Sequence, residues 1–186
     1  MDGSKSIYNN WECKQKTRHH SFINGIPISL IELKNAVDEK ATISNAYNQF
    51  QTYKKDIPII FVYNEILVIS DGIKTKVGTL TADKDRFMPW RSLDQKDSEV
   101  ELEVVIKEIF RKDRILDILQ NFILFETDGS EIIKKLAEYH QYHAVSKAVD
   151  STIQASLPSG NKRVGVVWHI LKAMGKASPW QSMLQN

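Results

Sequence analysis

The sequence predicts an α/β fold in which short buried strands alternate with amphipathic helices. An Asn24-Gly25 pair is a strong signal for a two-residue hairpin turn. The apolar run at residues 26–31 follows it and is typical of a strand buried on both faces. Further along, apolar residues recur at helical spacing between residues 100 and 112. Strands and helices are therefore mixed along one chain, which favours the α/β class.

Length and composition are those of an ordinary water-soluble domain. The chain has 186 residues, of which 42% are hydrophobic and 26% charged, and its formal net charge is +2. This charge neither requires nor excludes nucleic-acid binding. A single cysteine, Cys13, excludes an internal disulfide and suggests a reducing compartment. No apolar run reaches membrane-spanning length and the N-terminus does not resemble a signal peptide, so we expect a cytoplasmic protein without a membrane segment.

The other elements are predicted from periodicity and from turn residues. Thr42 or Asp38 can cap a helix that runs to about Lys55. A second helix follows the one at 100–112, and it begins near Asp113. A long helix, either continuous or interrupted, is expected over 132–155. Strands are expected at 59–63, 66–70, 74–80, 122–125 and 163–169.

Two opposite charges stand at the end of the strand that follows the hairpin. Glu32 and Lys34 are two residues apart, so on a strand they lie on the same face. Burying either charge alone is costly, and we expect them to pair with each other, with a metal or with solvent. On the next predicted helix, Gln49 and Tyr53 are four residues apart and share a face. Taken alone, these patterns also fit an ordinary strand-end ion pair and a half-buried helix face.

An ordered set of short strings carries a resemblance to a known family. They are 22–27 (FINGIP), 31–35 (IELKN), 46–49 (AYNQ), 51–54 (QTYK), 67–72 (LVISDG), 81–83 (TAD), 89–91 (PWR), 139–145 (YHQYHAV) and 165–169 (GVVWH). In order and spacing, residues 22–169 resemble the R subunit of type I restriction-modification enzymes. That subunit carries ATP-driven translocation and DNA cleavage.

The resemblance implies a particular domain order. Residues 22–98 would form a restriction-endonuclease-like nuclease core of the PD-(D/E)xK type, with a mixed sheet and flanking helices. Residues 99–155 would be a helical segment that leads to a motor. Residues 156–186 would hold the first strand of a truncated helicase-like ATPase domain and a degenerate tail.

The resemblance also implies roles for individual residues. Glu32 matches a carboxylate that binds Mg²⁺, and Lys34 matches the lysine that activates the attacking water and steadies charge at the phosphate. Gln49 and Tyr53 match a Gln-x-x-x-Tyr pattern that supports the site and the DNA backbone. Gln141 resembles a glutamine that reads the adenine of ATP. The implied partners are double-stranded DNA and the methyltransferase and specificity subunits of the complex.

Two departures from the family pattern limit what this chain can do. The family has Arg-Pro-Asp before its hairpin, whose Asp is the second Mg²⁺ ligand, and here the matching stretch is Lys16-Thr17-Arg18. The family's Gly-x-Gly-Lys-Ser phosphate loop is replaced by residues 170–177, where only Gly175-Lys176 matches.

Both stretches can be back-translated into codons that the genetic code permits. Read in a shifted frame, such codons give Pro-Asp-Ile-Ile-Leu for the first stretch and Gly-Asn-Gly-Lys-Ser for the second. We therefore hypothesise that residues 1–21 and 170–186 are out-of-frame translations that flank an in-frame remnant of a broken gene. His19 and His20 would then replace apolar residues on the first hairpin strand, where burying them costs free energy. We expect no ATP hydrolysis and no or very weak DNA cleavage.

Two other functions remain open from the sequence. The chain could be a small working Mg²⁺ nuclease in which Glu12 or Asp38 replaces the missing Asp. It could also be a non-enzymatic module that binds DNA or a partner subunit through the helices at 100–155. Plasmid cleavage would distinguish the first of these, and salt-dependent DNA binding without metal would favour the second.

Overall fold

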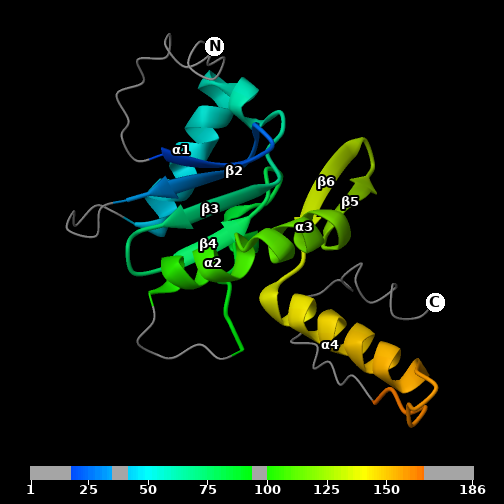
Figure 1. Cartoon of the computed structure of the whole chain (residues 1–186). Helices are drawn as coiled ribbons and strands as arrows, with labels where there is room; N and C mark the ends of the chain where they lie inside the picture. The colour runs from blue at the N-terminus through cyan, green and yellow to red at the C-terminus, as the bar shows by residue number, and fades with distance from the viewer. Residues whose placement is uncertain (1–17, 35–41, 94–99, 166–186) are drawn as a thin grey trace, which may run out of the picture.

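The computed structural model describes residues 18–34, 42–93 and 100–165. A four-stranded sheet with helices on both faces forms one part of the molecule, and a two-stranded ribbon and a long helix extend from it (Figure 1). The elements in chain order are β1 (Arg18–Ile23), β2 (Ile26–Leu33), α1 (Ile43–Asp56), the 3₁₀ helix η1 (Pro58–Phe61), β3 (Ile66–Ser70), β4 (Thr75–Gly78), the 3₁₀ helix η2 (Lys84–Arg86), α2 (Glu101–Ile109), α3 (Lys112–Asn121), β5 (Ile123–Asp128), β6 (Glu131–Leu136) and α4 (Tyr139–Ser156).

The main sheet is mixed, as the family resemblance implies. Its strand order is β1-β2-β3-β4, with β2 and β3 parallel and the two outer pairs antiparallel. Asn24 and Gly25 join β1 to β2 with φ angles of 50° and 82°, which are the positive values that a two-residue hairpin turn requires. The predicted hairpin is therefore confirmed.

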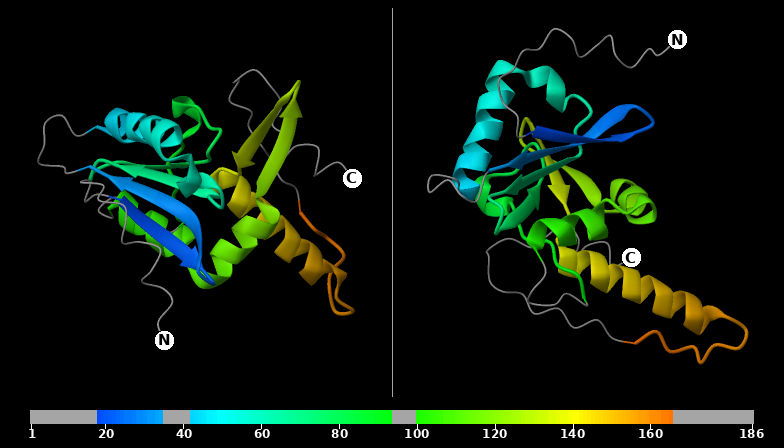
Figure 2. Two further views of the ribbon diagram at one scale, coloured as in Figure 1. Left: turned by 90° about the horizontal axis from the view of Figure 1, so that it is seen from above. Right: turned by 60° about the vertical axis from the view of Figure 1, so that its left-hand side comes forward.

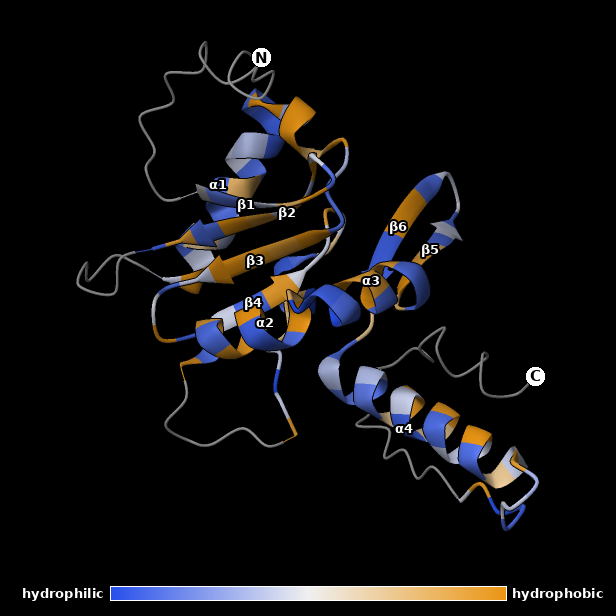
Figure 3. Cartoon of the chain, in the orientation of Figure 1, coloured by the Kyte–Doolittle hydropathy of each residue, from blue (hydrophilic) through white to orange (hydrophobic). Residues whose placement is uncertain are grey.

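Helices lie against both faces of this sheet (Figure 2), and an apolar layer fills the space on each face. On one face, Leu30, Leu67 and Ile69 pack against Phe50 and Tyr53 of α1. The other face packs against α2, α3 and the first turn of α4, with a core that includes Ile31, Val68, Val77, Trp90, Val105, Ile109 and Ile118. All five residues of β3 are buried, and Figure 3 shows the apolar character of β2 and β3. The sheet is thus the centre of the fold.

A β-bulge adjusts strand β2 to these two layers. The register with β1 shifts by one residue between Ser21 and Phe22, and Ile28 is passed over in the pairing. The extra residue changes which face the side chain takes. Ile28 consequently joins the layer of Ile31 rather than that of Leu30.

Helix α1 begins where the sequence predicts. The Thr42 side chain caps it by accepting a hydrogen bond from the backbone N–H of Asn45 at 3.2 Å. The alternative cap, Asp38, lies outside the described residues. The paired helices expected after residue 100 are also confirmed, as α2 and α3.

The strand expected at residues 59–63 is wrong. Pro58 begins the 3₁₀ helix η1 instead, and Ile59, Val62 and Tyr63 are exposed rather than buried in a sheet. Proline cannot donate a ladder hydrogen bond but suits the first turn of a helix. An apolar run alone does not separate these two outcomes.

The long helix expected at 132–155 is also wrong in its first part. Gly129, with φ +62°, turns the chain back, so that β6 pairs with β5 as an antiparallel ribbon. The predicted strand at 122–125 is correspondingly longer, as β5. Helix α4 begins only at Tyr139, where Glu138 and Gln141 form a capping box.

The ends of the described chain differ from expectation as well. Residues 18–21 belong to β1; His19 is exposed there, so the burial cost expected for it is absent, and His20 is partly buried. Of the strand expected at 163–169, only residues 163–165 are described; they form an exposed coil, and the rest lies outside the described residues, as do 94–98 and the degenerate tail. No helix within the described ranges has the length and apolar character needed to cross a membrane.

Candidate active site

Glu32 is the most unusual residue of the sheet. It is a carboxylate on a central strand with 0% of its surface exposed. Its strand position is paired with Ile69 of β3 on one side and with position 18 of β1 on the other. Its spacing from Leu30 places it on the face that α1 covers. A buried charge of this kind requires partners.

Lys34 supplies one partner, as the sequence predicts. Its Nζ lies 2.8 Å from Glu32 Oε1, and 21% of the lysine side chain is exposed. The backbone N–H of Lys34 donates to the carbonyl oxygen of Ser70 at 2.8 Å, which extends the parallel pairing of β2 and β3 by one residue. This bond fixes the direction in which the lysine leaves the strand.

Tyr53 supplies a second partner from helix α1. Its hydroxyl group donates to Glu32 Oε2 at 3.3 Å, and its ring is 3% exposed. The carboxylate therefore accepts a hydrogen bond at each oxygen from a different segment. Gln49 lies one helical turn before Tyr53 and is partly buried, so it shares the face of α1 that covers the sheet.

A supporting network behind Ser70 could not be found from the sequence. The Ser70 hydroxyl oxygen accepts hydrogen bonds from Thr75 Oγ1 at 3.0 Å and from the backbone N–H of Gly72 at 3.2 Å. The backbone N–H of Thr75 donates to Glu101 Oε2 at 2.6 Å. These bonds tie β3, β4 and the start of α2 together beside Lys34. In the sequence, the Asp71-Gly72 pair indicates a turn at this place, but it does not indicate these hydrogen bonds.

Among the described residues, the end of β2 lacks a complete set of magnesium ligands. In the ranges 18–34, 42–93 and 100–165, no three His, Cys, Asp or Glu side chains converge as metal ligands. Mg²⁺ is usually held by one or two carboxylates together with other oxygen ligands in near-octahedral geometry. Here Glu32 is a single carboxylate whose two oxygens already accept protein hydrogen bonds.

Gln141 lies in a different setting from the other predicted site residues. Its side-chain oxygen accepts a hydrogen bond from the backbone N–H of Glu138 at 2.9 Å, within the capping box of α4. This bond gives Gln141 a structural role, and adenine binding stays a prediction.

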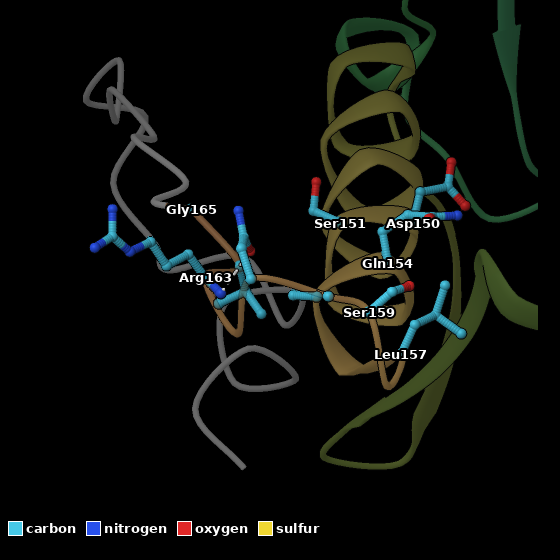
Figure 4. A pocket seen from close by; sticks show the side chains of 11 residues that line it. Asp150, Ser151, Gln154, Leu157, Ser159, Arg163 and Gly165 are labelled. Carbon is cyan, nitrogen blue, oxygen red and sulfur yellow. Dashed lines mark hydrogen bonds between the residues drawn. The ribbon is translucent and has the colours of Figure 1, made fainter.

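A pocket of about 680 Å³ lies at the opposite end of α4 and includes Asp150, Gln154 and Arg163 among its lining residues (Figure 4). It contains none of the predicted site residues. The candidate site at the end of β2 is therefore separate from this pocket.

Comparisons with known proteins agree with the strings in the sequence. The model of the family described as "Type I restriction enzyme R protein N terminus (HSDR_N)" matches residues 20–86, a span that includes Glu32, Lys34, Gln49 and Tyr53. The chain belongs to this family. In type I restriction enzyme R proteins this region is the N-terminal part, and the present chain is a fragment of that kind.

Two curated relatives show how much of such a protein is present. The chain is 44% identical to the type I restriction enzyme HindI endonuclease subunit of Haemophilus influenzae, over 80% of this chain and 15% of that subunit. It is 34% identical to the putative type I restriction enzyme MjaIXP endonuclease subunit of Methanocaldococcus jannaschii, over 80% of this chain and 16% of that subunit. The chain therefore spans less than a fifth of the length of these relatives.

Proposed function

We propose that this chain is the nuclease unit of a type I restriction endonuclease subunit, that it retains the scaffold of the site and that it does not cleave DNA. One observation carries the proposal. Position 18, which pairs directly with Glu32 across the β1–β2 hairpin, is an arginine.

The strand register explains why this position matters. The resemblance implies an Asp before the hairpin as the second Mg²⁺ ligand, and the shifted-frame string Pro-Asp-Ile-Ile-Leu puts that Asp at position 18. Directly paired residues of antiparallel strands occupy the same face, with Cβ atoms about 5 Å apart. An aspartate there would share a cation with Glu32, whereas an arginine brings a positive charge that opposes divalent-cation binding.

The wider activity belongs to the same proposal. In intact relatives we infer Mg²⁺-dependent cleavage of double-stranded DNA by a PD-(D/E)xK site, driven by an ATP-dependent motor in the cytoplasm. The partners would be the methyltransferase and specificity subunits. For this chain we propose neither ATP binding nor cleavage, because residues 170–177 lack most of the phosphate-loop pattern.

Plasmid nicking in the presence of Mg²⁺ tests the proposal. We expect the unmodified chain to leave supercoiled plasmid intact and Arg18→Asp to acquire Mg²⁺ binding, measured by calorimetry, together with slow nicking. The double variant Arg18→Asp/Lys34→Ala should bind Mg²⁺ but not nick. Nicking by the unmodified chain that disappears in Lys34→Ala would refute the proposal and favour a working nuclease.

A second candidate function is attachment to a partner subunit through helix α4. Val149 and Ile153 lie one turn apart on α4, Leu157 is the C-cap residue that follows the helix, and each of the three is more than 40% exposed. A stripe of this spacing on one helix face suits a protein interface. Co-purification with methyltransferase and specificity subunits, lost in Val149→Asp/Ile153→Asp, would support this function.

A further inference from the structure

The two sheets of the described chain have β1, β4, β5 and β6 as their outer strands. Two of these strands belong to the main sheet, and both are protected at their outer edge. Strand β1 is interrupted by the bulge between Ser21 and Phe22. Val77 of β4 exchanges backbone hydrogen bonds with Met88, which covers that edge. Bulges and coverage are common means of keeping a sheet edge from pairing with another chain.

Strand β6 of the ribbon is covered by the chain segment that follows β4. Thr79 Oγ1 donates to the carbonyl oxygen of Lys134 at 2.6 Å, and the backbone N–H of Lys134 donates to Thr81 Oγ1 at 2.8 Å. The Lys134 ammonium group also bonds to the Glu65 carboxylate at 2.8 Å. The ribbon is therefore fixed to the main sheet through β6, and β5 lies on its outer side (Figure 1).

The bonds of Lys134 also fix the direction in which the backbone of β5 points. Because Lys134 turns its N–H and carbonyl groups away from β5, its pair with Phe125 is a non-hydrogen-bonded pair of the antiparallel ladder. The backbone N–H and carbonyl groups of Phe125 consequently point to the outer edge of β5. No strand of the described chain pairs with that edge, and β5 (ILFETD) contains neither proline nor lysine.

The side chains beside this edge are apolar and exposed. Phe125 is 65% exposed, and Lys134 Nζ lies 5.3 Å from the centre of its ring. Ile132 of β6 is 64% exposed and shares a face with Lys134, because the two are two residues apart on the strand. An open strand edge with an apolar face is the surface on which β-strand addition takes place.

We propose that the open edge of β5 pairs with the same edge of a second copy of this chain. The two ribbons then form one four-stranded antiparallel sheet about a two-fold axis. Because the edge of β6 is already covered, the assembly stops at two chains.

The sequence of β5 selects one register for this pairing. Positions 123, 125 and 127 point their backbone groups outward, since they alternate along the strand. The register that centres Phe125 on Phe125 of the second copy uses all three positions of both chains. It also sets Leu124 opposite Glu126 of the second copy, so that no like charges face each other. A shift toward the ribbon tip would set Glu126 opposite Glu126 or Asp128 of the second copy, which is unfavourable.

Sedimentation equilibrium of the full chain tests the proposal. We expect the average mass to rise with concentration from that of one chain toward that of two. Phe125→Lys should raise the dissociation constant by at least about tenfold, because it sets two positive charges opposite each other at the axis. Phe125→Glu should act in the same way, and an equimolar mixture of the two variants should dimerise again.

A backbone variant and a matched control make the test specific. Thr127→Pro removes an outward N–H without removing a bond within the ribbon, and it should also weaken the dimer by about tenfold. Ile59→Lys makes the same charge change at a 65% exposed apolar residue of η1, and it should alter the dissociation constant by less than about twofold. Circular dichroism confirms that each variant is folded.

Three results would overturn the proposal. The first is a single-chain mass at every concentration. The second is a dimer that Ile59→Lys weakens as much as Phe125→Lys does, which would indicate general apolar association. The third is a dimer that Thr127→Pro leaves unchanged, since strand pairing through this edge needs the outward N–H.

Discussion

The end of strand β2 and the first turn of helix α4 each hold a polar residue that the sequence analysis assigned to function, yet the two regions use that residue differently. At β2, Glu32 receives donors from its own strand end and from α1, which are segments far apart in the sequence. At α4, Gln141 bonds to the backbone of Glu138, three residues away, and so completes the start of its own helix.

The difference teaches how to weigh such assignments. A polar contact within one helical turn is what capping alone requires. Burying a carboxylate costs desolvation free energy, and an apolar side chain at the same place would avoid that cost. Buried charges of this kind are concentrated at functional sites. We therefore propose that the functional residues lie at the end of β2.

The largest expected effect concerns packing in the two regions. Phe50→Ala removes a side chain with no exposure from the α1 layer over β2, and it should lower the free energy of unfolding by about 3–5 kcal/mol. Val149→Ala, on the 51% exposed stripe of α4, should change it by less than about 0.5 kcal/mol. Urea unfolding monitored by circular dichroism measures the change in unfolding free energy for each variant. Equal changes would show that the two regions do not differ in packing.

A smaller effect is expected from the Glu32–Lys34 pair. Lys34→Met removes the ion pair between Lys34 Nζ and Glu32 Oε1 and should cost about 1–3 kcal/mol of unfolding free energy, below the range for fully buried pairs because the lysine is partly exposed. Glu32→Leu/Lys34→Met removes both charges and should cost less than Lys34→Met alone. If the double variant is less stable than Lys34→Met, the buried Glu32 carboxylate does not need Lys34 as a partner.

The smallest effect is expected at the capping box. Gln141→Ala should cost about 0.5–1 kcal/mol, since it leaves the backbone N–H of Glu138 without its side-chain acceptor. Gln154→Ala, at an exposed site near the other end of α4, is the matched control and should be nearly neutral. A measurable loss in the control but not in Gln141→Ala would argue against the structural role.

Local signals made part of this fold predictable. The Asn24-Gly25 turn, the Thr42 cap and the spacing of apolar residues after 100 each act within a few residues, and each gave the correct element. The pairing of Glu32 with Lys34 followed from strand geometry, because residues two apart share a face.

Other features depend on contacts that a pattern does not contain. The apolar runs at 59–63 and 132–136 each fit a strand or a helix. Residues 132–136 form a strand because they pair with β5, whereas residues 58–61 form the 3₁₀ helix η1 and pair with no strand of the described chain. The bond from Lys34 to the Ser70 carbonyl oxygen exists only because β2 and β3 are parallel. Similarly, the sequence identified position 18 as anomalous, but only the register places it opposite Glu32.

The parallel pairing of β2 with β3 also bears on the order of folding. The β1–β2 hairpin closes through a two-residue turn and can form locally, on the microsecond timescale typical of hairpins. Strand β3 can join β2 only after the chain has crossed over through α1, a closure that costs more entropy and is intrinsically slower. We therefore expect Glu32 to stay hydrated until β3 joins β2, and its desolvation, its bond to Tyr53 and the anchoring of Lys34 on Ser70 to occur together in that later step.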